Sequence, residues 1–174
     1  QYPAVNVSYE AAVAYCSWLT DQYNALAEKK YKKVKFRLPT IAEYQIAAAS
    51  IKNPTSWNIN EQMVEVKLYP PGKEFGKEFE VKNVSAGDPD LLYPWFRVYN
   101  YRNSARNHKG CYLGNFKTPD HEKPCMPERM TSADGWMMMG PVETYFPNDI
   151  GLYDGVGNVA EKKKKKGKAC GGSW

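Results

Sequence analysis

The pattern of hydrophobic and polar positions predicts two helices near the start of the chain. From Ser8 to about Glu28, apolar side chains recur at intervals of three and four, which places them on one stripe of an amphipathic helix. That stripe consists of Ala12, Tyr15, Cys16, Leu19, Tyr23 and Leu26. A second helix is expected to begin after Thr40 and to run to about Ala49, because Thr40-Ile41-Ala42-Glu43 is a capping box.

The helical period is lost between Lys52 and Asp90, where Pro and Gly turns are frequent. Alternating apolar residues at Met63–Leu68 and Phe75–Val81 predict short strands within this segment. We interpret residues 52–90 as a long surface insertion that could form a hairpin.

The remainder of the chain, from Tyr93 to Trp174, is rich in aromatic residues, Gly, Asn and Asp and has no sustained helical period. Irregular structure of that length in a compact domain usually needs disulfides or metal ions to hold it. Cys111 and Cys125 could close a short loop in an oxidising compartment, whereas Cys16 lies on the apolar helix stripe and is expected to be a buried free thiol. The spacing of the cysteines argues against a zinc ribbon, since it contains no CxxC pair.

Composition and charge narrow the class of protein. A chain of 174 residues with 43% hydrophobic and 25% charged residues is expected to form one packed domain, residues 1–174, rather than a disordered or fibrous chain. Six of the 24 basic residues are Lys162 to Lys166 and Lys168, and the other 18 are balanced by 19 acidic residues, so the net charge of +5 does not indicate nucleic-acid binding. The lysines between Lys29 and Lys35 are expected to be a solvated helix end and loop.

No stretch approaches the roughly 18 consecutive apolar residues that a membrane span needs. Because the chain starts at Gln1 without Met and ends in a motif that leads into a strand, we expect it to be truncated at both ends, with any export signal outside it.

Four short motifs occur in order along the chain. They are residues 3–19 (PAVNVSYEAA leading to YCSWL), Arg37–Tyr44 (RLPTIAEY), Tyr93–Trp95 (YPW), and Phe146–Glu161 (FPNDIGLYDGVGNVAE) followed by Gly171-Gly172-Ser173-Trp174. Together they resemble the formylglycine-generating-enzyme family, also called the sulfatase-modifying-factor domain, over most of the chain outside residues 52–90. The resemblance implies an α+β, C-type-lectin-like fold with much irregular structure and few long helices.

The resemblance also implies two calcium sites. The first would use the side chains of Asn115 and Asp134 with the backbone carbonyls of Phe116 and Trp136. The second would use the side chains of Asp154 and Glu161 with the carbonyls of Gly157 and Val159. Mixed carboxylate, amide and carbonyl oxygens suit Ca²⁺, although Asp or Asn before Gly is also an ordinary turn former.

The chain departs from the family at the catalytic position. Active members hold copper with two cysteines just past the GGSW-type motif, whereas Cys170 precedes that motif, so no catalytic residue is assigned here. Lys162 to Lys166 also replace the Trp and polar residues that usually follow the second-site Glu. Three origins fit such a run: a natural exposed loop, an engineered patch or a placeholder for other residues.

Residues 99–117 and 141–149 resemble the gliding-motility and type IX secretion lipoproteins of Bacteroidota. This likeness implies a non-catalytic, calcium-stabilised interaction domain with protein partners, exported to the periplasmic face of the outer membrane and anchored by lipid outside the visible chain. The alternative is a fragment of a copper-dependent formylglycine-generating oxidase. A lectin-like ligand binder is a third possibility, supported by fold analogy alone.

Overall fold

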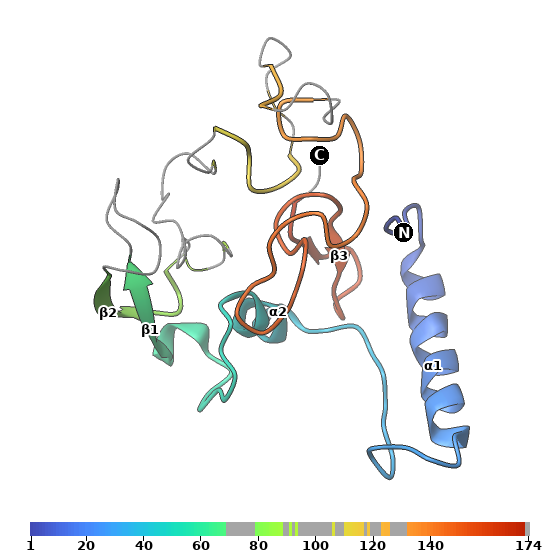
Figure 1. Cartoon of the computed structure of the whole chain (residues 1–174). Coiled ribbons are helices and arrows are strands. Elements are labelled where there is room, and N and C mark those ends of the chain that lie inside the picture. Colours follow the sequence, from blue (N-terminus) through green and yellow to red (C-terminus); the bar gives the residue numbers. More distant parts are fainter. Residues whose placement is uncertain are drawn as a thin grey trace.

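In the residues that the structure describes, the chain forms two helices, one 3₁₀ turn and two small antiparallel sheets joined by long irregular segments (Figure 1). The structure is a computed structural model that describes residues 1–68, 79–88, 91, 93, 106, 110–116, 118, 123–125 and 132–172. This combination confirms the predicted α+β class with much irregular structure. None of the helices in these ranges is long and apolar enough to cross a membrane.

Helix α1 spans Tyr9–Ala25 and begins as predicted, because the Ser8 hydroxyl accepts a hydrogen bond from the Ala11 N–H. It ends earlier than expected, since Leu26 is extended. The predicted stripe is only partly covered: Tyr15 and Leu26 are 59% and 52% exposed, and α1 has no fully buried residue. Cys16 is a free thiol as predicted, but it is half-buried rather than buried; it lines a hollow between α1 and the returning segment 33–38 (Figure 1).

Helix α2 spans Ile41–Ala48 and has the predicted capping box. The Thr40 hydroxyl accepts from the Glu43 N–H, and the Glu43 carboxylate accepts from the Thr40 N–H and from Arg37. At the other end of the helix, the Asn148 amide donates to the carbonyls of Ala47 and Ala48 at 2.8 and 3.3 Å. The C-terminal half of the chain is therefore attached to the end of α2.

A hairpin follows α2. The 3₁₀ turn η1 (Ile59–Glu61) leads into β1 (Met63–Leu68), which pairs with β2 (Glu80–Ser85) so that Met63 faces Ser85. The first predicted strand is confirmed. The second was placed at Phe75–Val81, of which residues 75–78 lie outside the described residues, and the observed strand begins at Glu80. The shift has a packing reason, because Val84 then stands opposite Val64 and both contact the core.

The buried core joins the hairpin to the end of α2. One cluster contains Val66 and Leu91, and a second contains Ala49, Ile59 and Ala86; Val64 packs against both. The segment interpreted as a surface insertion therefore contributes buried side chains.

The C-terminal half is held by local pairings. Cys111 and Cys125 form a disulfide, as the sequence allowed. Strand β3 (Glu161–Lys162) pairs with β4 (Ala169–Cys170), and the lysine-rich turn between them contacts both helical segments. Lys164 donates its N–H to the Pro39 carbonyl at 2.8 Å and accepts from the Tyr9 hydroxyl at 2.7 Å. Lys166 forms an ion pair with Glu10.

Candidate metal centre

Asp154 and Glu161 come from the irregular loop before β3 and from β3 itself. Asp154 adopts a left-handed backbone conformation (φ 50°), and its Oδ2 accepts a hydrogen bond from the Glu143 N–H at 2.8 Å. Its Oδ1 is buried without a hydrogen-bond partner, and so is the Oε2 of Glu161. Leaving a buried carboxylate oxygen unsatisfied is costly, which makes these two atoms candidates for binding a cation.

The pKa of Glu161 also indicates that the carboxylates of Asp154 and Glu161 could bind a cation. The pKa of Glu161 is raised from 4.5 to about 7, mainly by burial; a backbone hydrogen bond and Lys163 oppose the shift, and the nearby Asp154 carboxylate adds to it. Because both the burial and the neighbouring carboxylate disfavour the anion, a cation bound between them would remove both penalties.

Two glycines allow close backbone approaches in this region, one to Glu161 and one to Asn115. A Cβ at Gly171 (φ 92°) would lie 2.1 Å from the Glu161 Oε2, and a Cβ at Gly157 (φ 78°) would lie 2.1 Å from the Asn115 carbonyl oxygen. The Gly157 N–H also donates to the Gly171 carbonyl at 2.6 Å. Among the described residues, no donor reaches the carbonyls of Gly157 and Val159, so these oxygens are free to serve as ligands.

The first predicted site is built around Asn115 and Asp134. Asn115 is fully buried; its amide donates to the Met138 carbonyl at 2.6 Å, and its Oδ1 has no partner. The Asp134 carboxylate is 2% exposed and accepts from the Phe116 N–H at 2.8 Å and from Ser132 at 2.5 Å. The structure thus joins Asn115, Phe116 and Asp134, but this site has one unsatisfied oxygen where the second has two.

The ring of Trp136 packs against Gly140, which in turn contacts Asn158. A Cβ at Gly140 would lie 2.6 Å from the Trp136 ring, and the Gly140 N–H donates to the Asn158 Oδ1 at 2.8 Å.

Asn158 connects the two sites and was not among the predicted site residues. It is 1% exposed; its N–H donates to the Asn115 carbonyl at 2.7 Å, and its Oδ1 accepts from the Asn115 amide at 3.3 Å. Gly157 and Asn115 also form a β-bridge. The Asp-Gly-Val-Gly-Asn motif is the sequence signal that could have identified Asn158.

Lys163 is a second residue that sequence reasoning missed. It is 1% exposed, its Nζ has no hydrogen-bond partner, and the Nζ lies 3.5 Å from the centre of the Tyr44 ring. Burial lowers the pKa of Lys163, with nearby Glu161 acting against the shift. Tyr44 in turn donates its hydroxyl to the Gly155 carbonyl at 2.6 Å, so the site loop, α2 and Lys163 form one packed unit.

The described residues contain no group of three or more His, Cys, Asp or Glu side chains that could hold a metal ion by themselves. Any metal in this region would therefore depend on amide and backbone oxygens as well as carboxylates, which suits a hard cation. The two free thiols do not form a pair: Cys16 lines a hollow beside α1, and Cys170 lines another beside α2.

Fold and site together define an α+β domain whose irregular C-terminal half surrounds buried oxygen atoms. The model of the sulfatase-modifying factor enzyme 1-like domain matches residues 1–169, and the chain belongs to this family. Searches of curated proteins and of solved structures found no match.

Proposed function

We propose that this domain is a non-catalytic, calcium-stabilised interaction domain of a periplasmic, outer-membrane-associated lipoprotein that serves gliding motility or type IX protein secretion. The C-type-lectin-like topology is part of the proposal. The observation that carries it is the pair of buried, unpartnered carboxylate oxygens on Asp154 and Glu161, at the positions where the family resemblance implies calcium.

Calcium would occupy the second site between the side chains of Asp154 and Glu161 and the carbonyls of Gly157 and Val159. The ion would supply the positive charge that these two carboxylates lack. The first site would use Asn115 and Asp134 with the carbonyls of Phe116 and Trp136; we expect it to bind more weakly, because two protein donors already engage Asp134.

A disulfide supports the proposed periplasmic location, and exposed aromatic residues on α1 support a protein partner. The Cys111–Cys125 disulfide is typical of an oxidising compartment such as the periplasm. Helix α1 exposes Trp18 at 54%, and the Trp18 ring stacks on Tyr15 with ring centroids 5.7 Å apart. Exposed aromatic side chains of this kind are enriched at protein interfaces, which supports a protein partner.

The alternative function is a copper-dependent formylglycine-generating oxidase. The family's two copper-binding cysteines would follow Trp174, and the separation of Cys16 from Cys170 gives no copper pair within the described residues. The sequence of the full-length gene past Trp174 discriminates between the two functions.

The test is to purify the full-length protein from its native membranes in calcium. We expect it in the outer-membrane fraction, bound to other proteins. Recovery as a lone monomer without membrane association would contradict the proposal, and conversion of a peptide cysteine to formylglycine by the copper-loaded protein would establish the alternative.

A further inference from the structure

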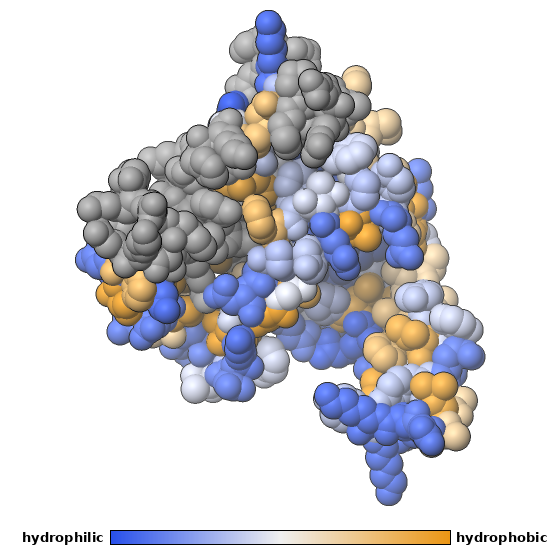
Figure 2. All heavy atoms as spheres, in the orientation of Figure 1, coloured by the Kyte–Doolittle hydropathy of each residue, from blue (hydrophilic) through white to orange (hydrophobic). Residues whose placement is uncertain are grey.

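The loop after α1 is one of two strongly basic parts of the described chain; the other is the turn at residues 162–168, which has six lysines. Lys29, Lys30, Lys32, Lys33 and Lys35 lie within seven residues, and no acidic residue follows them until Glu43. Figure 2 shows these hydrophilic atoms gathered at the lower right, where the loop extends beyond the end of α1. We call residues 26–35 the basic tip.

The basic tip is held in place by the last turns of α1. Asn24 makes two hydrogen bonds with the backbone of Val34, accepting from its N–H at 2.9 Å and donating to its carbonyl at 2.7 Å. The Tyr31 N–H donates to the Tyr23 hydroxyl at 3.0 Å. These contacts position the lysines before any ligand arrives.

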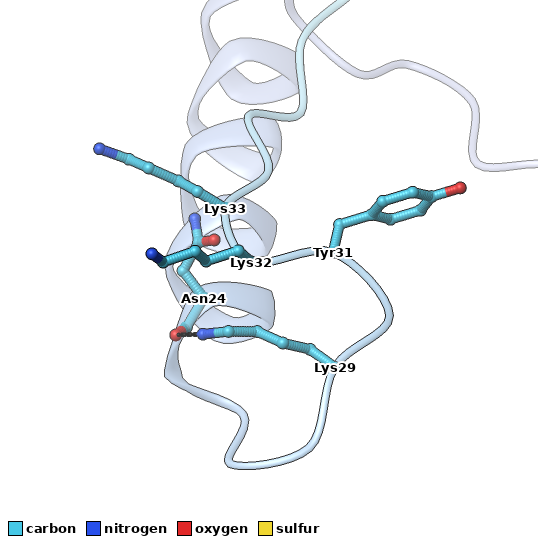
Figure 3. Close-up of a pocket in the computed structure, with 5 residues that line it drawn as sticks. All are labelled: Asn24, Lys29, Tyr31, Lys32 and Lys33. Atoms are coloured by element: carbon cyan, nitrogen blue, oxygen red, sulfur yellow. Dashed lines mark hydrogen bonds between the residues drawn. The ribbon is translucent and has the colours of Figure 1, made fainter.

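The lysine side chains of the tip differ in their contacts and directions. Figure 3 shows the Lys29 side chain turned back to the helix, where its Nζ donates to the Asn24 carbonyl at 2.5 Å, a favourable place for a cation at a helix C-terminus. Lys32 and Lys33 extend outward on the same side of an open hollow of about 710 Å³. Neither has an acidic partner within the part of the chain that the structure describes.

The tip also exposes apolar surface beside its charges. Leu26 is 52% exposed and Tyr31 is 57% exposed, with Tyr31 pointing away from Lys32 and Lys33 (Figure 3). A projecting surface that carries lysines as well as exposed aliphatic and tyrosine side chains suits the interface of a bilayer, where amphipathic side chains sit between water and lipid.

We propose that the basic tip docks on a bilayer surface that carries anionic phospholipids. A cluster of lysines near such a surface gains about 1 kcal/mol for each charge, which requires no shaped pocket. Nucleic acid is less well matched, because Arg37, the guanidinium that follows the tip, is paired with Glu43. The proposal depends neither on calcium nor on the proposed cellular function.

The test is co-sedimentation of the whole protein with vesicles of equal parts phosphatidylcholine and phosphatidylglycerol. We expect binding at low salt that is lost on vesicles of phosphatidylcholine alone and in about 1 M NaCl, where the screening length falls to about 3 Å. The double variant Lys32→Gln/Lys33→Gln should weaken partitioning roughly tenfold to thirtyfold. The matched control, Lys165→Gln/Lys168→Gln, removes the same charge from the other lysine-rich turn and should bind almost as wild type.

Three results would overturn the proposal: absence of binding to the anionic vesicles, an equal loss in both double variants, or displacement by millimolar inorganic phosphate, which would indicate a small-anion site. Equal or tighter retention of a single-stranded RNA would assign the tip to nucleic acid instead. All four side chains are exposed, so melting curves of the variants should match wild type and exclude misfolding.

Discussion

At the scale of single residues, the backbone conformation at position 171 and its closeness to Glu161 explain why this residue is a glycine. Gly171 has a left-handed backbone and lies against the Glu161 carboxylate. We predict that Gly171→Ala displaces Glu161 and removes most of the stabilisation that we expect from calcium, in addition to causing backbone strain of about 1 kcal/mol. The measurement is the melting temperature with calcium and with chelator.

A matched control exists nearby. Gly167 has a similar φ of 77°, but a Cβ at this position would meet no atom within 4 Å, so Gly167→Ala should show backbone strain alone. Equal calcium responses in the two variants would contradict a role for Gly171 beside the carboxylate.

The buried lysine at 163 gives a second prediction. Its ammonium lies in the field of Glu161 and would repel a cation bound there. Lys163→Met keeps the volume and removes the charge, so it should tighten calcium binding by about fivefold or more. Calcium titration followed by the melting temperature measures this change. The exposed neighbour provides the comparison: if Lys164→Met shifts the titration as much as Lys163→Met, burial of Lys163 is irrelevant.

At the scale of elements, the ion pair within the capping box predicts a pH dependence. Hydrogen bonds from Arg37 and from the Thr40 N–H lower the pKa of Glu43 from 4.5 to about 2. A lowered acid pKa contributes stability that is present above about pH 4.5 and is lost as the pH falls toward about 2.

The corresponding measurement compares the free energy of unfolding of wild type and Glu43→Gln across this range. Because the side chain is partly exposed, we expect a difference of no more than about 1 kcal/mol at neutral pH. A difference that stays constant down to about pH 3 would show that the charge of Glu43 contributes nothing.

The Cys111–Cys125 disulfide is another local feature that is expected to stabilise the fold. It joins residues 14 apart in the sequence. Closing a loop of about 15 residues stabilises the folded state by about 3 kcal/mol in the chain-entropy description. We expect Cys111→Ser/Cys125→Ser to lower the free energy of unfolding by that order, measured by denaturant titration. Cys16→Ser, which changes a free thiol on α1, should have little effect; a similar loss in both would argue against the disulfide.

These elements also show what sequence could and could not establish. The Ser8 and Thr40 caps depend on neighbours within one turn, so both helix starts were predictable. The β2 register and the burial of Lys163 depend on distant partners, Val64 and Tyr44, which no local pattern specifies. The predicted calcium residues came from family resemblance; the unsatisfied oxygens of Asn115, Asp154 and Glu161 are visible only in three dimensions.

At the scale of the whole molecule, the second candidate metal site connects parts that are distant in sequence. Its loop contacts α2 through Tyr44, the first site through Asn158, and the region near α1 through the turn after β3. Since this half has only the two-residue strands β3 and β4 among its described residues, its order depends on such contacts and, in our account, on calcium.

The most direct test of this account is thermal melting of the protein in millimolar calcium and in excess chelator. Calcium at a hundred times its Kd would stabilise the native state by about 2.7 kcal/mol, so the chelated protein should melt at a clearly lower temperature. Asp154→Asn keeps an acceptor for the Glu143 N–H but removes the charge, and it should abolish most of the difference, whereas Asp21→Asn on the exposed face of α1 should preserve it. Superimposed melts of the wild-type protein in calcium and chelator would contradict the account, because Asp154 and Glu161 would then belong to an ordinary turn.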